Sequence, residues 1–220
     1  MSRMSKEELR EDPVLEWIQG AIETTQKNSR WILIGVVAVV VIIFGVVMIG
    51  NSRRAAHVES ARQLLGGQSQ YLQGNYAAAE TQLQQLLTGG AGGDIAQRAR
   101  IVLGDALSAQ ERPAEALDAY ESALSGGTAE LKAAAHRGKA ASLESLARFA
   151  EAAAAFRAAS EIETGFVNED LLSLARCSLA AGDAAEAKTV LERLQKIDNP
   201  RSIKQAKVAF YLAQAEAALQ

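Results

Sequence analysis

Residues suited to covalent or metal chemistry are scarce in this sequence, and so are residues that break helices. There is one cysteine, Cys177, and the two histidines, His57 and His136, lie far apart. A lone cysteine cannot form an intramolecular disulfide or a cysteine-based zinc site, and neither histidine has a second histidine or a cysteine beside it. Only three prolines and 5% aromatic residues accompany an alanine- and leucine-rich chain, which favours helices over strands. The composition predicts an all-α protein without a metal site or cofactor.

A large charge of one sign is also missing. The formal net charge is −3, from 23 basic and 26 acidic residues, which excludes a basic nucleic-acid surface. The glycine-rich run at 89–93 is not followed by Lys-Ser or Lys-Thr and joins two predicted helices, so we interpret it as a flexible loop rather than a phosphate-binding loop. The adjacent acids Glu169 and Asp170 fit a helix N-terminus better than a catalytic pair. We expect no catalytic residues, no nucleic-acid partner and no small-molecule substrate.

One long apolar run stands near the start of the chain. Between Arg30 and Arg53 lie 22 residues without a charge, and 14 of those from Trp31 to Ile49 are Val, Ile, Leu or Phe. About 20 helical residues cover the roughly 30 Å hydrocarbon core of a bilayer. A helix in a soluble core would show polar residues every few positions, and this run shows none. We predict one transmembrane helix at 31–50 and a juxtamembrane linker at 51–57.

The flanks of this run bear on its processing and its orientation. The leader of about thirty residues contains six acids, and Asn51-Ser52-Arg53-Arg54 is a poor cleavage site, which favours an uncleaved signal anchor over a cleaved signal peptide. Five Lys or Arg precede the run, and three follow it closely. The positive-inside rule then places the N-terminus in the cytoplasm and the rest of the chain on the other side of the membrane.

The N-terminal arm at 1–30 contains a helix signal of its own. Asp12-Pro13 is typical of a helix start, and apolar residues recur at near-helical spacing from Val14 to Ile22. This predicts a short amphipathic helix in a cytoplasmic arm. The helix either lies on the cytoplasmic leaflet or docks a partner, or it only leads into the span.

Small residues mark one side of the predicted span. Gly35, Ala38 and Gly45 share that side and would permit close packing with another helix. A strict Gly-x-x-x-Gly motif is not present, and small residues are common in valine-rich spans. Packing against a partner helix and an ordinary lipid-facing side both remain open.

The chain after residue 57 repeats itself. Ala79, Ala116, Ala152 and Ala187 are separated by 37, 36 and 35 residues, a period that indicates helical hairpin repeats. A small residue stands twelve positions before each alanine, and a bulky residue stands four positions after it. The small residues are Gly67, Gly104, Ala140 and Ala175, and the bulky ones are Leu83, Tyr120, Phe156 and Leu191. Antiparallel helices approach closely only where small side chains meet, so we predict stacked hairpins that share one continuous core.

Turn residues stand where this period requires them. Turns inside the hairpins are predicted at Gly74-Asn75, Glu111-Arg112-Pro113, Leu146-Ala147-Arg148 and Gly182-Asp183, and two of these four contain glycine. Loops between hairpins are predicted at 88–93, 125–127, 163–165 and 198–200. A final helix at 202–219 should cover the open face of the last hairpin, which completes a repeat domain at 58–220.

This pattern resembles the tetratricopeptide repeat family, whose hairpins carry a small residue at position 8, alanine at 20 and a bulky residue at 24. The second hairpin matches best, with Leu103-Gly104, Ala114-Glu115-Ala116-Leu117, Tyr120 and Ala123-Leu124. The third, around Ala147-Arg148-Phe149-Ala150-Glu151-Ala152, lacks the turn glycine. The resemblance covers about residues 58–198 and implies an α-solenoid of about four hairpins that binds other proteins.

Proteins of this family bind peptides or other proteins in an inner groove lined by positions 2, 5, 9 and 12 of each first helix. Carried onto this chain, these positions include ten residues, which we call the predicted groove residues: Gln68, Tyr71, Arg98, Ile101, Asp105, Arg137, Glu144, Glu169, Leu172 and Arg176. Some family members clamp a chaperone's C-terminal carboxylate with Lys and Asn. Leu64, Ile101, Gln68 and Asp105 stand at those places here, so that partner is not expected.

The layout of a short arm, one span and a divergent repeat domain resembles the ancillary subunit of the bacterial Sec translocon. That resemblance implies a scaffold or chaperone-like adaptor in the bacterial inner membrane, with its repeat domain in the periplasm, that assists exported or envelope proteins. The alternative is a structural accessory subunit of another inner-membrane complex, held by its transmembrane helix. In either case the expected partners are other proteins and the lipid bilayer.

Overall fold

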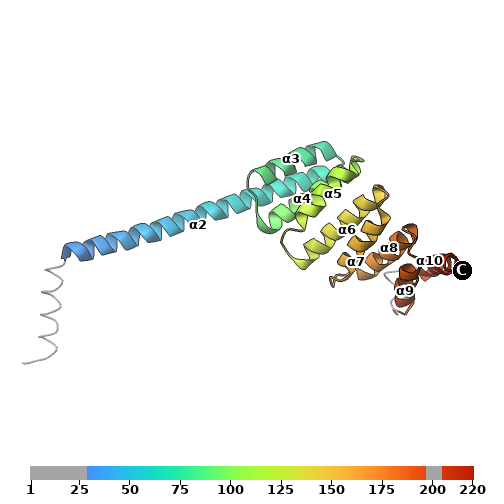
Figure 1. Ribbon diagram of the computed structural model, residues 1–220. Helices are drawn as coiled ribbons and strands as arrows, with labels where there is room; N and C mark the ends of the chain where they lie inside the picture. Colours follow the sequence, from blue (N-terminus) through green and yellow to red (C-terminus); the bar gives the residue numbers. More distant parts are fainter. Residues whose placement is uncertain (1–28, 197–204) are drawn as a thin grey trace, which may run out of the picture. The chain divides into compact units, whose positions relative to one another are not determined.

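The computed structural model describes residues 29–196 and 205–220, and the chain divides into two compact units, Met1–Ala56 and His57–Gln220. Within the described stretches the regular elements are all α-helices, as predicted. They are α2 (Ser29–Leu72), α3 (Tyr76–Thr88), α4 (Gly93–Ala109), α5 (Pro113–Ala123), α6 (Ala129–Ser145), α7 (Phe149–Ser160), α8 (Val167–Ala180), α9 (Ala184–Gln195) and α10 (Gln205–Ala218) (Figure 1). The predicted helix of the N-terminal arm and the predicted loop at 198–200 lie outside the described residues.

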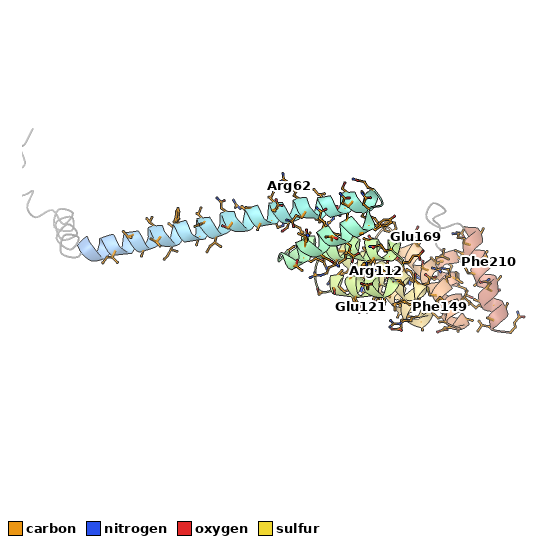
Figure 2. The ribbon with its side chains drawn as sticks, turned by 90° about the horizontal axis from the view of Figure 1, so that it is seen from above. Arg62, Arg112, Glu121, Phe149, Glu169 and Phe210 are labelled. Carbon is orange, nitrogen blue, oxygen red and sulfur yellow. The ribbon has the colours of Figure 1, made fainter. Side chains whose placement is uncertain are left out.

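The first unit contains the N-terminal part of α2. The predicted span at 31–50 and the predicted linker at 51–57 both lie within this helix. The large apolar side chains described between Ile34 and Ile49 are 54–70% exposed, and side chains project from both sides of the helix in Figure 2. By length and composition α2 could cross a membrane. A helix that is apolar all round is stable only where lipid or protein covers it.

The second unit is a series of helical hairpins followed by one more helix. The end of α2 pairs with α3, α4 with α5, α6 with α7, and α8 with α9, while α10 packs on α9 and α8. The sequence-derived turns are therefore confirmed at all four places, because each lies between the helices of one pair. The observed α10 corresponds to the predicted final helix at 202–219, and only its part from Gln205 is described.

The four turns adopt the same backbone conformation although only two contain glycine there. Gly74 and Gly182 have φ of 80° and 86°, in the left-handed region that glycine enters without a steric cost. Glu111 and Ala147 occupy the equivalent places with φ of 60° and 57°. Hairpin packing thus imposes the left-handed turn on residues that enter it at a cost of about 1 kcal/mol or more.

The four alanines that define the period lie in the interior of the hairpins. Ala79, Ala116, Ala152 and Ala187 are all 0% exposed. In the first two hairpins the small residue faces the bulky one as predicted, because a Cβ at Gly67 would lie 2.7 Å from Leu83, and a Cβ at Gly104 would lie 2.7 Å from Tyr120. The remaining small and bulky residues, Ala140, Ala175, Phe156 and Leu191, are buried as well.

The prediction of one continuous core is wrong. The buried apolar side chains form two clusters that divide at α5, with Tyr120 in the first and Leu117 in the second. Where α6 meets Tyr120 of the first cluster it carries Gly138, which has no side chain to extend that cluster. Lys139 on α6 forms an ion pair of 2.8 Å with Glu121 on α5, and Leu117 on α5 belongs to the second cluster together with Ala140 and Leu143 of α6. Charged and apolar contacts therefore both link the second and third hairpins.

Candidate functional site

The predicted groove residues lie on the first helix of each hairpin. Gln68 and Tyr71 belong to α2, three residues to α4, two to α6 and three to α8. Arg98 is exposed and the others are partly buried, which is compatible with one side of each helix facing solvent. Their ion pairs differ between the N-terminal half of the groove, on α2 and α4, and the C-terminal half, on α6 and α8.

In the C-terminal half, three of the four charged groove residues form ion pairs across α6 and α8, whereas Glu169 forms none with a described residue. Arg176 forms two hydrogen bonds with the carboxylate of Glu144, of which Nη2 to Oε2 measures 2.9 Å. Arg137 Nε lies 2.9 Å from Oδ1 of Asp170. These two ion pairs link the third and fourth hairpins and occupy the side chains that a partner would otherwise contact.

Asp170 lies in the first turn of α8, as its sequence position predicted, and it is also the buried partner of Arg137, a pairing that was not predicted from the sequence. Its side chain is only 2% exposed, and Arg137 binds it while also donating to Thr164 Oγ1 at 3.1 Å and lying 4.8 Å from the ring centroid of Phe166. Desolvation raises the pKa of Asp170, and Arg137 opposes that rise. A usable signal exists in the sequence, since Arg137 and Asp170 are opposite charges 33 residues apart, close to one repeat.

The N-terminal half of the predicted groove is less occupied. Arg98 forms no ion pair with any residue in the described part of the chain, and Ile101 packs at the edge of the first core cluster. The ring of Tyr71 lies 5.7 Å from that of Tyr76, and Asp105 accepts a hydrogen bond of 2.6 Å from the Tyr120 hydroxyl. This end offers a cation, an aliphatic side chain and an aromatic ring to a partner.

Burial raises the pKa values of Asp105, Tyr120 and Tyr71 at this end of the groove. Desolvation raises the pKa of Asp105, and the hydrogen bond from Tyr120 only partly opposes it. The pKa of Tyr120 is raised as well, first by burial and then by the charge of Asp105. The pKa of Tyr71 is raised by the same two causes. Both tyrosines are therefore neutral hydrogen-bonding groups near neutral pH.

We expect Asp105→Asn to stabilise the repeat domain at neutral pH and to lose that advantage in acid. An acid whose pKa is raised by folding favours the folded state most when protonated, below its unfolded pKa of 3.8, and costs stability as the pH rises through its folded pKa. Asparagine accepts the same hydrogen bond and does not ionise. Urea unfolding of both proteins between about pH 3 and pH 7 measures this; a difference that does not vary with pH would contradict it.

The histidines and the cysteine are not assembled into a site. No group of three potential metal ligands occurs among the residues that the structure describes. His136 has its pKa lowered by burial and by Lys139, and Cys177 is buried with a raised pKa, so its thiol is protonated and unreactive. Cys177 belongs to the second core cluster, in agreement with the predicted packing role.

Comparisons with known proteins agree with this architecture. Residues 145–209 match the tetratricopeptide repeat family. The fold is similar to the crystal structure of nearly identical tetratricopeptide-like repeats from a Podosopora anserina kinesin light chain-type protein, with 17% identity, a TM-score of 0.56, and coverage of 72% of this chain and 86% of that one. It is also similar to Pseudomonas aeruginosa PilF, with 19% identity, a TM-score of 0.55, and coverage of 72% and 68%. No curated protein sequence matches this chain.

These likenesses concern the fold. Repeats of this kind act as protein-interaction scaffolds, because a stack of hairpins offers an extended surface rather than an enclosed reaction site. The helical hairpins of this chain therefore form a tetratricopeptide-like α-solenoid, a scaffold for binding other proteins.

Proposed function

We propose that this chain is a membrane-anchored scaffold that binds a protein partner through the N-terminal half of its predicted groove. The observation that carries the anchor is the exposure of the large apolar side chains described between Ile34 and Ile49, in a run without a single charge. Water is a poor solvent for such a helix, whereas each large apolar residue favours insertion into a bilayer by several tenths of a kcal/mol.

The pairing pattern supports the choice of the N-terminal half. Arg137, Glu144 and Arg176 already have partners within the protein, and a ligand would have to break those ion pairs to use them. Arg98, Ile101 and Tyr71 need no such rearrangement. The matching partner is a peptide segment that presents a carboxylate to Arg98 and an apolar side chain to Ile101 and Tyr71.

The cellular role follows from the layout. We place the N-terminus in the cytoplasm and the repeat domain in the periplasm, and the partner among the translocon subunits, exported proteins or envelope proteins that meet there. A reporter enzyme fused after Gln220 reads the sidedness directly.

A structural accessory subunit is the second candidate. In that case Gly35, Ala38 and Gly45 would pack against helices of a larger membrane complex. Within the described part of this chain, no atom lies within 4 Å of a Cβ built at Gly35 or Gly45, so that side of the helix is free for a partner. The two candidates differ in which surface holds the partner.

One purification distinguishes them. The full-length chain is fractionated, extracted in mild detergent and purified with its partners, which mass spectrometry identifies and quantifies. We expect Tyr71→Ala combined with Arg98→Glu to reduce recovery of translocon subunits or exported clients at least tenfold, while Leu at positions 35, 38 and 45 leaves it unchanged. The converse pattern supports the accessory subunit. A full-length protein that stays in solution after lysis without detergent would refute the anchor.

A further inference from the structure

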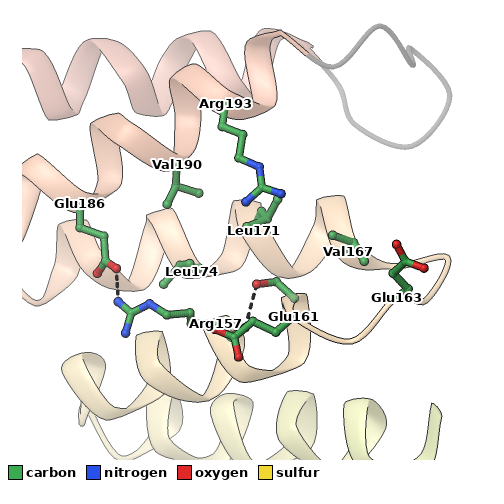
Figure 3. Close-up of a pocket in the computed structure, with 10 residues that line it drawn as sticks. Arg157, Glu161, Glu163, Val167, Leu171, Leu174, Glu186, Val190 and Arg193 are labelled. Atoms are coloured by element: carbon green, nitrogen blue, oxygen red, sulfur yellow. Dashed lines mark hydrogen bonds and ion pairs between the residues drawn. The ribbon is translucent and has the colours of Figure 1, made fainter. Parts of the chain in front are cut away.

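A cavity of about 590 Å³ opens between α7, α8 and α9, and none of the residues that line it is a predicted groove residue (Figure 3). Its apolar surface comes from Val167, Leu171 and Leu174 on α8 and Val190 on α9. Leu171 and Leu174 are buried in the second core cluster, and the two valines are half-buried. The volume lies within the range of roughly 300–1,000 Å³ that is typical of ligand-binding pockets.

The preceding hairpin has polar residues where this cavity has leucines. Ala152 and Ala187 are 35 residues apart, and at the same offset Leu174 corresponds to Lys139 and Leu171 corresponds to His136. Lys139 forms its ion pair with Glu121 there. The repeat geometry alone therefore does not require an apolar surface between these helices, and the last hairpin has one because of its own side chains.

A positive side chain and two negative ones lie on opposite sides of the cavity. Arg157 and Glu186 neutralise each other, and Glu186 also accepts a hydrogen bond of 2.9 Å from Ser178. Arg193 on α9 is exposed and has no ion pair with a described residue. Glu161 and Glu163 lie across the cavity from it (Figure 3). An occupant thus meets a cation on one side and two carboxylates on the other.

We propose that this cavity, which we call the α7–α9 pocket, is a second protein-docking site, separate from the groove. Its occupant is an amphipathic helix of a partner protein that inserts a large apolar side chain against Leu174 and Val190. A carboxylate of that helix pairs with Arg193, and a basic side chain faces Glu161 and Glu163. Opposite charges at the two rims fix the direction of the helix, while the apolar side chain contributes most of the affinity. The scaffold can then hold two partners at once.

The test uses a displayed library of helix-forming peptides, randomised on one face, selected on the full-length chain in mild detergent. We expect enriched peptides to carry an apolar residue flanked by an acid on one side and a base on the other. Fluorescence anisotropy then measures binding of the best peptide. Leu174→Lys, which introduces the residue of the preceding hairpin, should weaken binding at least tenfold, whereas Tyr71→Ala in the groove should leave it unchanged.

A charge exchange keeps the proposal falsifiable if Leu174→Lys does not fold. Arg193 is exposed, so Arg193→Glu preserves the fold, and it should weaken the peptide about tenfold. Exchanging the peptide's acid for lysine should restore that affinity. Enriched peptides without the charge pattern, or binding that ignores both pocket variants, would overturn the proposal. Self-association abolished by Arg193→Glu would also overturn it, because the pocket would then hold a second copy of this chain.

Discussion

Gly138→Ala should destabilise the repeat domain by about 1–3 kcal/mol, the usual cost of overpacking. A Cβ at Gly138 would lie 2.5 Å from Cδ1 of Tyr120, well inside the roughly 3.5–4.0 Å of an ordinary carbon contact. The ring cannot move away freely, because Gly104 on α4 is close to it as well and its hydroxyl is bound to Asp105. Thermal or urea unfolding of the full-length chain, followed by circular dichroism, measures the change.

The sign of this effect separates packing from helix propensity. Propensity alone predicts that alanine in place of a helical glycine stabilises by about 1 kcal/mol. Gly165→Ala, in the turn before α8, is the control for adding a methyl group where nothing lies within 4 Å of it, and its effect should stay within about 0.5 kcal/mol. A stabilised Gly138→Ala protein would show that Tyr120 is not confined between the second and third hairpins.

Arg137→Met should cost about 3–5 kcal/mol, because it leaves a buried carboxylate without its counter-charge. Asp170 is 2% exposed in its side chain, and Arg137 supplies both its ion pair and a stacking contact with Phe166. The deficit should shrink in acid, since a protonated Asp170 needs no cation. Urea unfolding at neutral and acidic pH measures both the size of the loss and its dependence on pH.

A second substitution distinguishes the lost charge pair from lost packing. Adding Asp170→Asn to Arg137→Met should recover most of the stability, because the buried charge is then gone. The exposed ion pair of Arg148 with Glu151 provides a comparison, and breaking it should cost no more than about 1 kcal/mol. Equal losses in the single and double variants would place the cost in packing around Arg137 instead.

The hairpin architecture could be predicted from the sequence because its determinants are local and periodic. Alanines at 37, 36 and 35 residue intervals mark the close helix contacts, and all four are fully buried. The hairpin turns could be placed even where glycine is absent, since the period requires a turn there. What the sequence did not indicate is that Glu111 and Ala147 adopt the left-handed conformation, because that conformation is imposed by the helices on either side.

The candidate sites were less predictable. The ten predicted groove residues followed from a resemblance in register, and the pairing of Arg137, Glu144 and Arg176 depends on how α6 lies beside α8. The division of the core at α5 likewise depends on which side chains of α6 face it. The α7–α9 pocket was not anticipated, since its apolar surface combines residues from α8 and α9 that no motif connects.

Sequence alone determined the elements of this protein: a charge-free apolar run long enough to span a bilayer, and a series of hairpins spaced by their alanines. Those features are properties of consecutive residues, and their physical causes, hydrophobicity and close packing at small side chains, act over a few helical turns. Only the tertiary structure decided which charged side chains form ion pairs within the solenoid and which stay unpaired and available to a partner. An ion pair or a pocket requires side chains about 30 residues apart to meet, and stacking one hairpin on the next brings them together.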